Sequence, residues 1–210
     1  MKILLTAFDP FGGETVNPAQ EAVKLVADTI AGAEVVKLTV PTVFSKAMDT
    51  AARAIRDIRP TAVVCIGQAG GRAAITPERV AINMMDAQIP DNAGAMPSDT
   101  PIVPGGPAAY FSTLPIKSMV RAIRDKGLPA AVSNTAGTFV CNRLMYGVLH
   151  LAAHEFPHMR CGFIHVPYAM EQAARRQEPT FAMSVSDITR GLKAALEALA
   201  EDMRGTMGGV

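Results

Sequence analysis

The sequence lacks the features that mark several specialised classes of protein. It has no tryptophan and three cysteines, and its 20 basic and 19 acidic residues leave a net charge of +1. So few cysteines argue against a disulfide framework and fit a reducing compartment. The balanced charge favours neither a nucleic-acid binder nor an acidic tail. We therefore expect a cytoplasmic protein that does not bind nucleic acid.

A long hydrophobic run is also missing. The first apolar segment, Ile3 to Ala7, follows a single lysine and ends before Asp9. It is too short for the core of a signal peptide or for a membrane span, so we expect neither export nor a membrane partner. The chain does have 49% hydrophobic residues over 210 positions, which is enough for a full core. Its length predicts one domain over residues 1–210, with a frayed tail at 205–210.

Short apolar runs alternate with amphipathic segments along the chain. The apolar runs predict strands at 2–8, 34–40, 62–66, 130–134 and 162–166, with a short one at 80–83. Apolar residues at helical spacing predict helices at 18–30, 44–58, 115–126, 138–156 and 186–204. Strands that are apolar on both faces and separated by helices are typical of a largely parallel sheet covered on both sides. The sequence therefore predicts an α/β fold.

The connection from Met84 to Pro115 breaks this alternation. It contains six prolines and three glycines, yet it carries apolar side chains such as Ile102 and Val103. A connection of this length without secondary structure is uncommon and usually has a function or lies at an interface. Because exposed apolar loops often mark contact surfaces, we expect this segment to pack between subunits.

Cys141 is the first candidate for chemistry. It follows a polar turn that contains Gly137, and the predicted helix begins near Thr138, so the thiol lies in the first helical turn. Unpaired N–H groups and the positive end of the helix dipole would lower the pKa of the thiol and favour the thiolate. The same N–H groups could hold an oxyanion. The alternative is a small buried hydrophobic residue, which is how we interpret Cys65 and Cys161.

His165 and Glu78 are the next candidates. His165 stands near the end of the strand at 162–166, and the carboxyl ends of parallel strands form the edge at which open α/β sheets bind ligands. A lone histidine in an apolar strand is more often a core residue, but an activated cysteine at the same edge favours a catalytic role. Glu78 enters a short apolar segment and could orient an imidazole. The alternative is a surface carboxylate paired with Arg79.

Two further patterns are weaker. His150, His154 and His158 stand four apart, which on paper is a metal-ligand spacing. Pro157 should end the helix before His158, so only two of the three share a face, and we expect no metal site. The Gly-Gln-Ala-Gly-Gly-Arg turn at 67–72 could bring the backbone close to a ligand, but it fits neither glycine-rich nucleotide motif.

Five short motifs are distributed along the chain and can be compared with known families as a group. Residues 133–142 read Ser-Asn-Thr-Ala-Gly-Thr-Phe-Val-Cys-Asn, and residues 67–83 begin with Gly-Gln-Ala-Gly-Gly-Arg and end with Glu-Arg-Val-Ala-Ile-Asn. The shorter ones are Phe-Asp-Pro-Phe-Gly-Gly at 8–13, Ile-Pro-Asp-Asn at 89–92 and His-Val-Pro-Tyr at 165–168. Together they resemble the pyroglutamyl peptidase I family, also called pyrrolidone-carboxylate peptidases. The two long segments resemble its cysteine and glutamate signatures.

The resemblance implies both a fold and an activity. The implied fold is a three-layer α/β/α sandwich with a mostly parallel, mixed and twisted sheet, phosphorylase- or hydrolase-like, which commonly assembles as a homotetramer. The implied activity is that of a cysteine peptidase that removes an N-terminal pyroglutamyl residue from peptides through a thioester. No metal or organic cofactor is implied.

The resemblance also implies roles for single residues. Cys141 would be the nucleophile, His165 the general acid and base, and Glu78 the residue that orients His165. The implied substrate-binding residues are Phe8, Phe11, Gln68 and Phe139. Gln88 stands where the family commonly has an arginine near the active site, so we expect it to border the site or the oxyanion. Ala7, in place of the usual glycine, is a small departure.

Two other functions remain open from the sequence alone. A nucleoside-phosphorylase-like transferase would share a similar fold, but it needs a phosphate site with convergent arginines. The turn at 67–72 is the one candidate for such a site, and this function leaves Cys141 without a role. A catalytically silent oligomeric binding protein is the third possibility.

Overall fold

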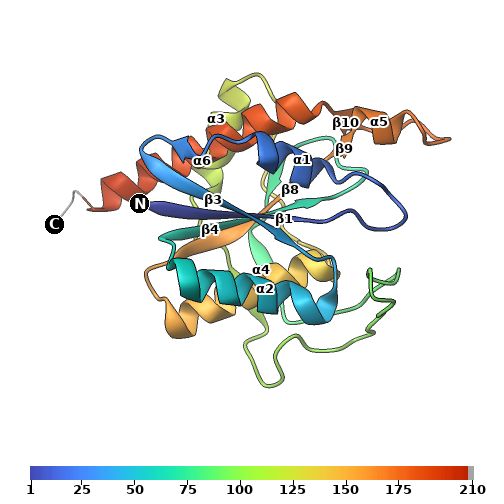
Figure 1. The fold of residues 1–210 in the computed structure, drawn as a ribbon, viewed down its shortest axis with the longest axis horizontal. Helices are drawn as coiled ribbons and strands as arrows, with labels where there is room; N and C mark the ends of the chain where they lie inside the picture. The colour runs from blue at the N-terminus through green and yellow to red at the C-terminus, as the bar shows by residue number, and fades with distance from the viewer. Residues whose placement is uncertain (208–210) are drawn as a thin grey trace.

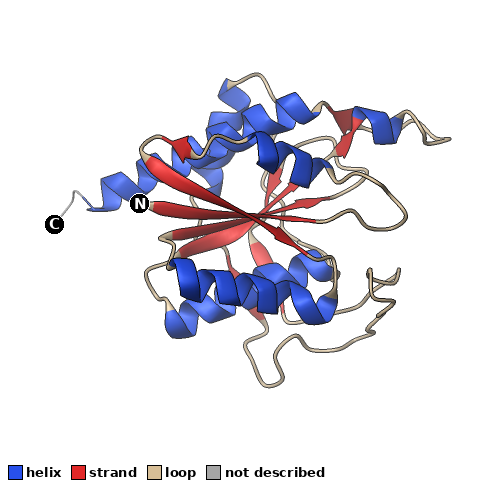
Figure 2. Cartoon of the chain, viewed as in Figure 1, coloured by secondary structure: helices blue, strands red, loops and turns tan. Residues whose placement is uncertain are grey.

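The computed structural model describes residues 1–207, and its centre is a six-stranded sheet between two layers of helices (Figure 1, Figure 2). The sheet, in the order β2-β3-β1-β4-β8-β5, consists of β1 (Lys2–Phe8), β2 (Thr29–Ile30), β3 (Ala33–Val40), β4 (Ala62–Gln68), β5 (Thr76–Pro77) and β8 (Arg160–Val166). The four central strands run parallel, and the short β2 and β5 pair antiparallel at the edges. The predicted three-layer α/β fold with a mixed, mostly parallel sheet is confirmed.

Helices cover both faces because the parallel strands are apolar on both sides. One layer holds α1 (Pro18–Leu25), α3 (Ile116–Asp125) and α6 (Val185–Met207), and the other holds α2 (Phe44–Ile58) and α4 (Val140–Glu155) (Figure 1). Along β1, Ile3 and Leu5 belong to the core beneath the first layer, whereas Leu4 and Phe8 belong to the core beneath the second. This is the two-residue alternation of a strand, and it leaves β1 without a solvent-facing side.

The segments that follow the parallel strands gather at one end of the sheet. β9 (Tyr168–Ala169), α5 (Met170–Ala173) and β10 (Ala182–Met183) follow β8 and lie beyond the carboxyl ends of the strands, as does part of the long connection, drawn in green (Figure 1). Within residues 1–207, no helix is both long enough and apolar enough to cross a membrane.

The predicted strand at 130–134 is wrong as a regular strand. The segment makes two isolated bridges, from Ala130 to Ile75 and from Ser133 to Glu78. The edge position beside β8 is taken by β5, of which Pro77 is a member. Proline has no N–H to donate, so the ladder between the two segments is interrupted there.

Three helix ends differ from the prediction. The first helix ends at Leu25 rather than near residue 30, because β2 turns back onto β3 through Ala31 and Gly32, both with positive φ. The helix that carries Cys141 begins at Val140 rather than 138. The last helix continues through Gly205 to Met207, where a frayed tail was expected. The rest of that expected tail, residues 208–210, lies outside the described residues.

The long connection after Met84 is ordered by pairing and capping. β6 (Val80–Ile82) pairs with β7 (Ala109–Phe111) in a separate two-stranded sheet. Phe44 is the first residue of α2, and its N–H donates to the buried Asp91 carboxylate at 2.8 Å. Val43 at the N-cap position of α2 has no polar side chain, so Asp91 supplies the cap from a distant part of the chain.

Candidate active site

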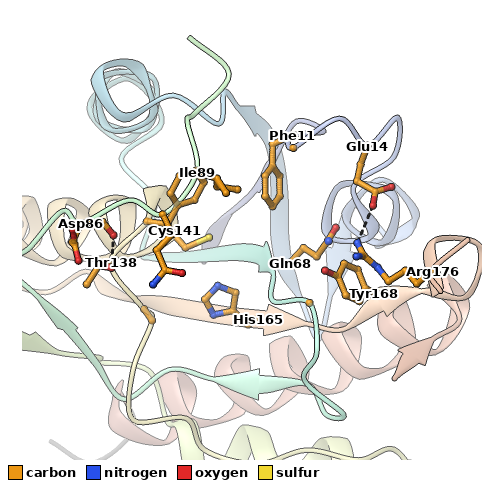
Figure 3. A pocket seen from close by; sticks show the side chains of 15 residues that line it. Phe11, Glu14, Gln68, Asp86, Ile89, Thr138, Cys141, His165, Tyr168 and Arg176 are labelled. Atoms are coloured by element: carbon orange, nitrogen blue, oxygen red, sulfur yellow. Dashed lines mark hydrogen bonds and ion pairs between the residues drawn. The ribbon is translucent and has the colours of Figure 1, made fainter. Parts of the chain in front are cut away.

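A cavity of about 620 Å³ lies at the carboxyl edge of the parallel strands. Its walls come from the turn after β1, the ends of β4 and β8, the start of α4 and the long connection, and they include Cys141 and His165. Figure 3 shows these two side chains facing the same space, with Phe11 on one side of it and Gln68 on another. The sequence prediction that both residues meet at this sheet edge agrees with this placement.

The start of α4 is fixed by two side chains next to the thiol. The buried Asn142 accepts the N–H of Ile82 at 3.0 Å and donates to the carbonyls of Ile82 and Met84 at 2.8 and 2.9 Å. The Thr138 hydroxyl donates to the carbonyl of Asp86 at 2.7 Å. Cys141 therefore sits in the first helical turn, on a helix end that is tied to the long connection.

The backbone of β4 passes directly beneath the thiol. A Cβ at Gly67 would lie 3.0 Å from Sγ of Cys141 and 2.7 Å from the ring of Phe163. Neither a buried ring nor a packed thiol can give way easily at such distances, so this position accommodates only glycine.

His165 is held in one orientation by Glu78. The imidazole Nδ1 lies 2.7 Å from Oε1 of Glu78, and both side chains are buried. Since Nδ1–H donates to the carboxylate, Nε2 is the basic nitrogen of the ring. The same Oε1 accepts Arg72 Nη1 at 2.5 Å. The alternative pairing of Glu78 with Arg79 does not occur, because Arg79 donates to Asn134 at 2.7 Å.

Burial and charge set the protonation states of the site. Burial opposes ionisation of Glu78, but the hydrogen bond from His165 and the charge of Arg72 favour the carboxylate, and the pKa of the carboxyl lies below its ordinary value. Burial lowers the pKa of His165, although Glu78 acts in the opposite direction. The resting pair is therefore an ionised carboxylate beside a neutral imidazole.

The expected low pKa of Cys141 is wrong for the resting site. Burial, reinforced by the negative charge of Glu78, raises the pKa of the thiol to about 12. The charge of Arg72 and the backbone N–H of Cys141 at the helix start favour the thiolate, but burial dominates. A proton acceptor must therefore take the thiol proton before Cys141 can act as a nucleophile.

The structure places most of the implied substrate-binding residues in the cavity wall. Phe11, Gln68, Gln88 and Phe139 all line it. Phe8 does not, because it points into the core beneath α2 and α4, where its ring centroid is 6.3 Å from that of Phe163. Phe8 is thus a core residue, and its expected place in the pocket wall is wrong.

The cavity also contains residues that sequence reasoning missed. Glu14 and Arg176 form an ion pair at 3.0 Å at the far side from Cys141, and the Arg176 guanidinium lies 4.0 Å from the centre of the Tyr168 ring (Figure 3). The sequence carries no local signal for this pair, since its members are 162 positions apart. Arg72 was missed differently: it and Glu78 stand six positions apart within one signature, where opposite charge could have suggested the pair.

The three histidines with metal-ligand spacing do not come together as a metal site. His150 and His154 share a face of α4, with ring centroids 4.2 Å apart, and Nδ1 of His150 lies 2.9 Å from the Tyr110 hydroxyl. His158 lies beyond the end of that helix. In the part of the chain that the structure describes, no group of three or more His, Cys, Asp or Glu side chains could hold a metal ion.

Comparison with known proteins gives one consistent result. A family described as pyroglutamyl peptidase matches residues 1–202. The chain is similar to a pyrrolidone-carboxylate peptidase of Streptococcus pyogenes serotype M4, with 58% identity over 96% of this chain and 93% of that protein.

Solved structures agree with the sequence relatives. Pyroglutamyl peptidase I of Bacillus amyloliquefaciens is 51% identical, with a TM-score of 0.91 over 95% of this chain and 97% of that one. A mutant pyrrolidone carboxyl peptidase of Pyrococcus furiosus is 42% identical, with a TM-score of 0.93 over 97% of this chain and all of that one. Matches of this extent, for a chain whose cavity contains Cys141 and His165, show that the chain belongs to the pyroglutamyl peptidase family.

Proposed function

We propose that Cys141, His165 and Glu78 are the catalytic residues with which this cysteine peptidase removes an N-terminal pyroglutamyl residue from peptides. The activity follows from the family. The observation that carries the assignment of residues is the cavity that Cys141 and His165 share, with Nδ1 of His165 bonded to the buried Glu78.

The first half of the reaction forms a thioester. Nε2 of His165 takes the proton of the Cys141 thiol, and the thiolate attacks the carbonyl carbon of the pyroglutamyl residue. The N–H groups at the start of α4 stabilise the negative oxygen that forms. The imidazolium then gives its proton to the leaving amine nitrogen as the C–N bond breaks. Glu78 stabilises the imidazolium throughout, which compensates for the burial that disfavours it.

The second half regenerates the thiol. Neutral His165 takes a proton from a water molecule, whose oxygen attacks the thioester carbon. Collapse of the second tetrahedral intermediate releases pyroglutamate, and the thiolate of Cys141 recovers its proton from His165. Side chains and water complete the cycle, so we expect no metal or organic cofactor to be needed.

The cavity wall suits a neutral lactam. The rings of Phe11 and Phe139 lie 6.2 Å apart, and Phe44 braces Phe139 edge-on at 5.2 Å. These rings supply apolar walls, and Gln68, which accepts Nε2 of Gln172 at 3.3 Å, keeps its amide N–H groups for the substrate. Gln88 would contribute hydrogen bonds without charge where relatives commonly carry an arginine.

The transferase alternative is not favoured. Its phosphate site would need Arg72, but this guanidinium already pairs with Glu78 and donates to Thr76 and the carbonyl of Thr135. The family and the relatives are peptidases, and the cavity gives Cys141 a role that a phosphorylase would not.

We also propose that the chain forms one domain and assembles as a homotetramer in the cytoplasm. The three cysteines are free thiols, which fits a reducing compartment. Ile102 and Val103 pack against the core beneath α2 and α4. The side chains of the long connection that remain for subunit contacts include Met96 and Phe111, 58% and 68% exposed.

The direct test is release of a chromophoric amine from a pyroglutamyl amide, with the matching proline amide as the control. We expect cleavage of the first alone, and its loss after alkylation of the thiol. Equal cleavage of both amides, or cleavage by the alkylated protein, would contradict the proposal.

A further inference from the structure

Arg72 connects three segments around the proposed catalytic residues. Its Nη1 lies 2.5 Å from Oε1 of Glu78, the same oxygen that accepts Nδ1 of His165 at 2.7 Å. Nη1 also donates to the hydroxyl of Thr76 at 2.6 Å, and Nη2 donates to the carbonyl of Thr135 at 3.0 Å. Arg72 thus links the turn after β4, in which it stands, to the β5 segment and to the turn that leads to Cys141.

The turn after β4 explains why Arg72 can reach inward. Arg72 donates its N–H to the carbonyl of Ala69, and Gly71 has a φ of 85°, a value that favours glycine. A Cβ at Gly70 would collide with the ring of Tyr168. These two glycines let the turn pack tightly against the start of β9, which sends the Arg72 side chain toward the sheet with 27% of it exposed.

We propose that Arg72 is a positioning residue of the hydrolysis, an inference that rests on the proposed function. Its guanidinium fixes the Glu78 carboxylate against the His165 ring and ties that pair to the turn before Cys141. Oε1 receives both donors, so rotation of the carboxylate about its terminal torsion would break two hydrogen bonds rather than one. The planar fork of arginine divides the three contacts between two nitrogens held in one plane, whereas lysine offers its donors from a single nitrogen on a flexible stem.

The guanidinium also balances the charge around the imidazole. The titratable and charged groups near His165, from the elements packed around it and along the cavity, are Cys65, Arg72, Glu78, Asp86, Cys141 and Tyr168, with the Glu14–Arg176 pair farther away. The positive charge of Arg72 disfavours a second positive charge on His165, in the same direction as burial. The resting imidazole therefore stays neutral and can take the thiol proton.

The test compares three variants with the wild type. Arg72→Met removes the charge and the hydrogen bonds, Arg72→Lys keeps the charge but loses the fork, and Arg79→Met is the matched control. Arg79 is in the same signature, but it donates to Asn134 and does not contact Glu78. Two quantities are measured: the titration of His165 by NMR with labelled histidine, and the pH profile of kcat and KM on a pyroglutamyl amide.

We expect Arg72→Met to move the His165 titration and the acid limb of kcat/KM to higher pH, because a positive neighbour has been removed. We expect Arg72→Lys to leave the titration near that of the wild type but to lower kcat by roughly ten- to a hundredfold, with little change in KM. Arg79→Met should match the wild type in both measurements.

Two results would overturn the inference. One is a His165 titration in Arg72→Met that coincides with those of the wild type and Arg79→Met. The other is a kcat in Arg72→Lys equal to that of the wild type, which decides the question even if Arg72→Met does not fold. The NMR titration of His165 needs no substrate. A wild type that failed to cleave the amide would therefore overturn the proposed function, while the titration would still decide whether Arg72 acts on His165.

Discussion

Asn142 offers a sharp test of how α4 presents its thiol. Replacement by alanine removes three hydrogen bonds from a fully buried side chain, those to Ile82 N–H, Ile82 C=O and Met84 C=O. The Ile82 carbonyl keeps the N–H of Met84 as a donor. Two backbone groups therefore lose the partner that the structure gives them, an N–H and a C=O.

Each buried polar group left without a partner costs about 1–3 kcal/mol. With two such groups and partial relaxation, we expect Asn142→Ala to lower the free energy of unfolding by about 3 kcal/mol. In a chain of this size that corresponds to a fall in Tm of roughly 6–12 °C. Because Asn142 is next to Cys141, kcat/KM should also fall about tenfold or more.

Urea unfolding and a thermal scan measure the first effect, and turnover of a pyroglutamyl amide measures the second. Asn134→Ala is the matched control, since that side chain is exposed and should change stability by less than about 0.5 kcal/mol. Asn142→Asp keeps the acceptor for Ile82 N–H but turns a carboxylate toward two carbonyls. It should be at least as destabilised at neutral pH and recover as the carboxyl is protonated in acid. An Asn142→Ala protein within 0.5 kcal/mol of the wild type would refute the reasoning.

Other predictions test the remaining steps. Cys141→Ser and Cys141→Ala should keep the fold by circular dichroism and lose nearly all turnover; substantial turnover by the alanine variant would contradict the nucleophile. Removal of His165 should be as damaging as loss of the thiol, Glu78→Gln should leave measurable activity, and the effects should be strongly non-additive. If the losses simply multiplied in combined variants, the three residues would not act as a unit. Prolonged dialysis against a chelator, with reductant present, should leave the rate unchanged, and a metal whose removal abolished turnover would contradict the mechanism. Polar substitutions at Met96 and Phe111 should shift light scattering toward smaller species before circular dichroism reports unfolding, whereas a wild type that is monomeric at micromolar concentration would remove the basis for the tetramer.

The layered fold and two of the proposed catalytic residues follow from local patterns. Buried parallel strands are recognisable because they are apolar on both faces, and their carboxyl ends identify the edge that holds Cys141 and His165. Glu78 is different, since its burial depends on an N–H···O bond of 2.9 Å to the Phe163 carbonyl, far along the chain. No periodicity encodes that contact, so the residues alone left a surface carboxylate paired with Arg79 as the alternative, and the resemblance decided in favour of the orienting role.

The errors also have physical causes. Phe8 was expected in the pocket wall from its position in a motif, but strand alternation turns it into the core. The pKa of Cys141 was expected to fall because a helix start is visible in the sequence, whereas the burial that raises it is a tertiary property. The regular strand at 130–134 failed because the neighbouring Pro77 cannot complete a ladder.

The cap that Asp91 places on α2 has a consequence for local opening. One oxygen of this carboxylate accepts the N–H of Phe44, and the other accepts those of Ala93 and Ala95 at 2.8 and 2.9 Å. Protection of these amides at the helix start and in the 91–95 turn therefore depends on one side chain, and loss of its charge should weaken all three hydrogen bonds together.

Burial opposes the charge on Asp91, but the N–H groups of Phe44 and the turn outweigh it and hold the pKa of the carboxyl below its ordinary value. The stabilisation is thus complete above the pKa of an unfolded aspartate and is lost as the pH falls through the lower folded value. Acid should then release the helix start and the connection that carries Gln88 to the cavity in the same step, so that hydrogen exchange at the two places rises together.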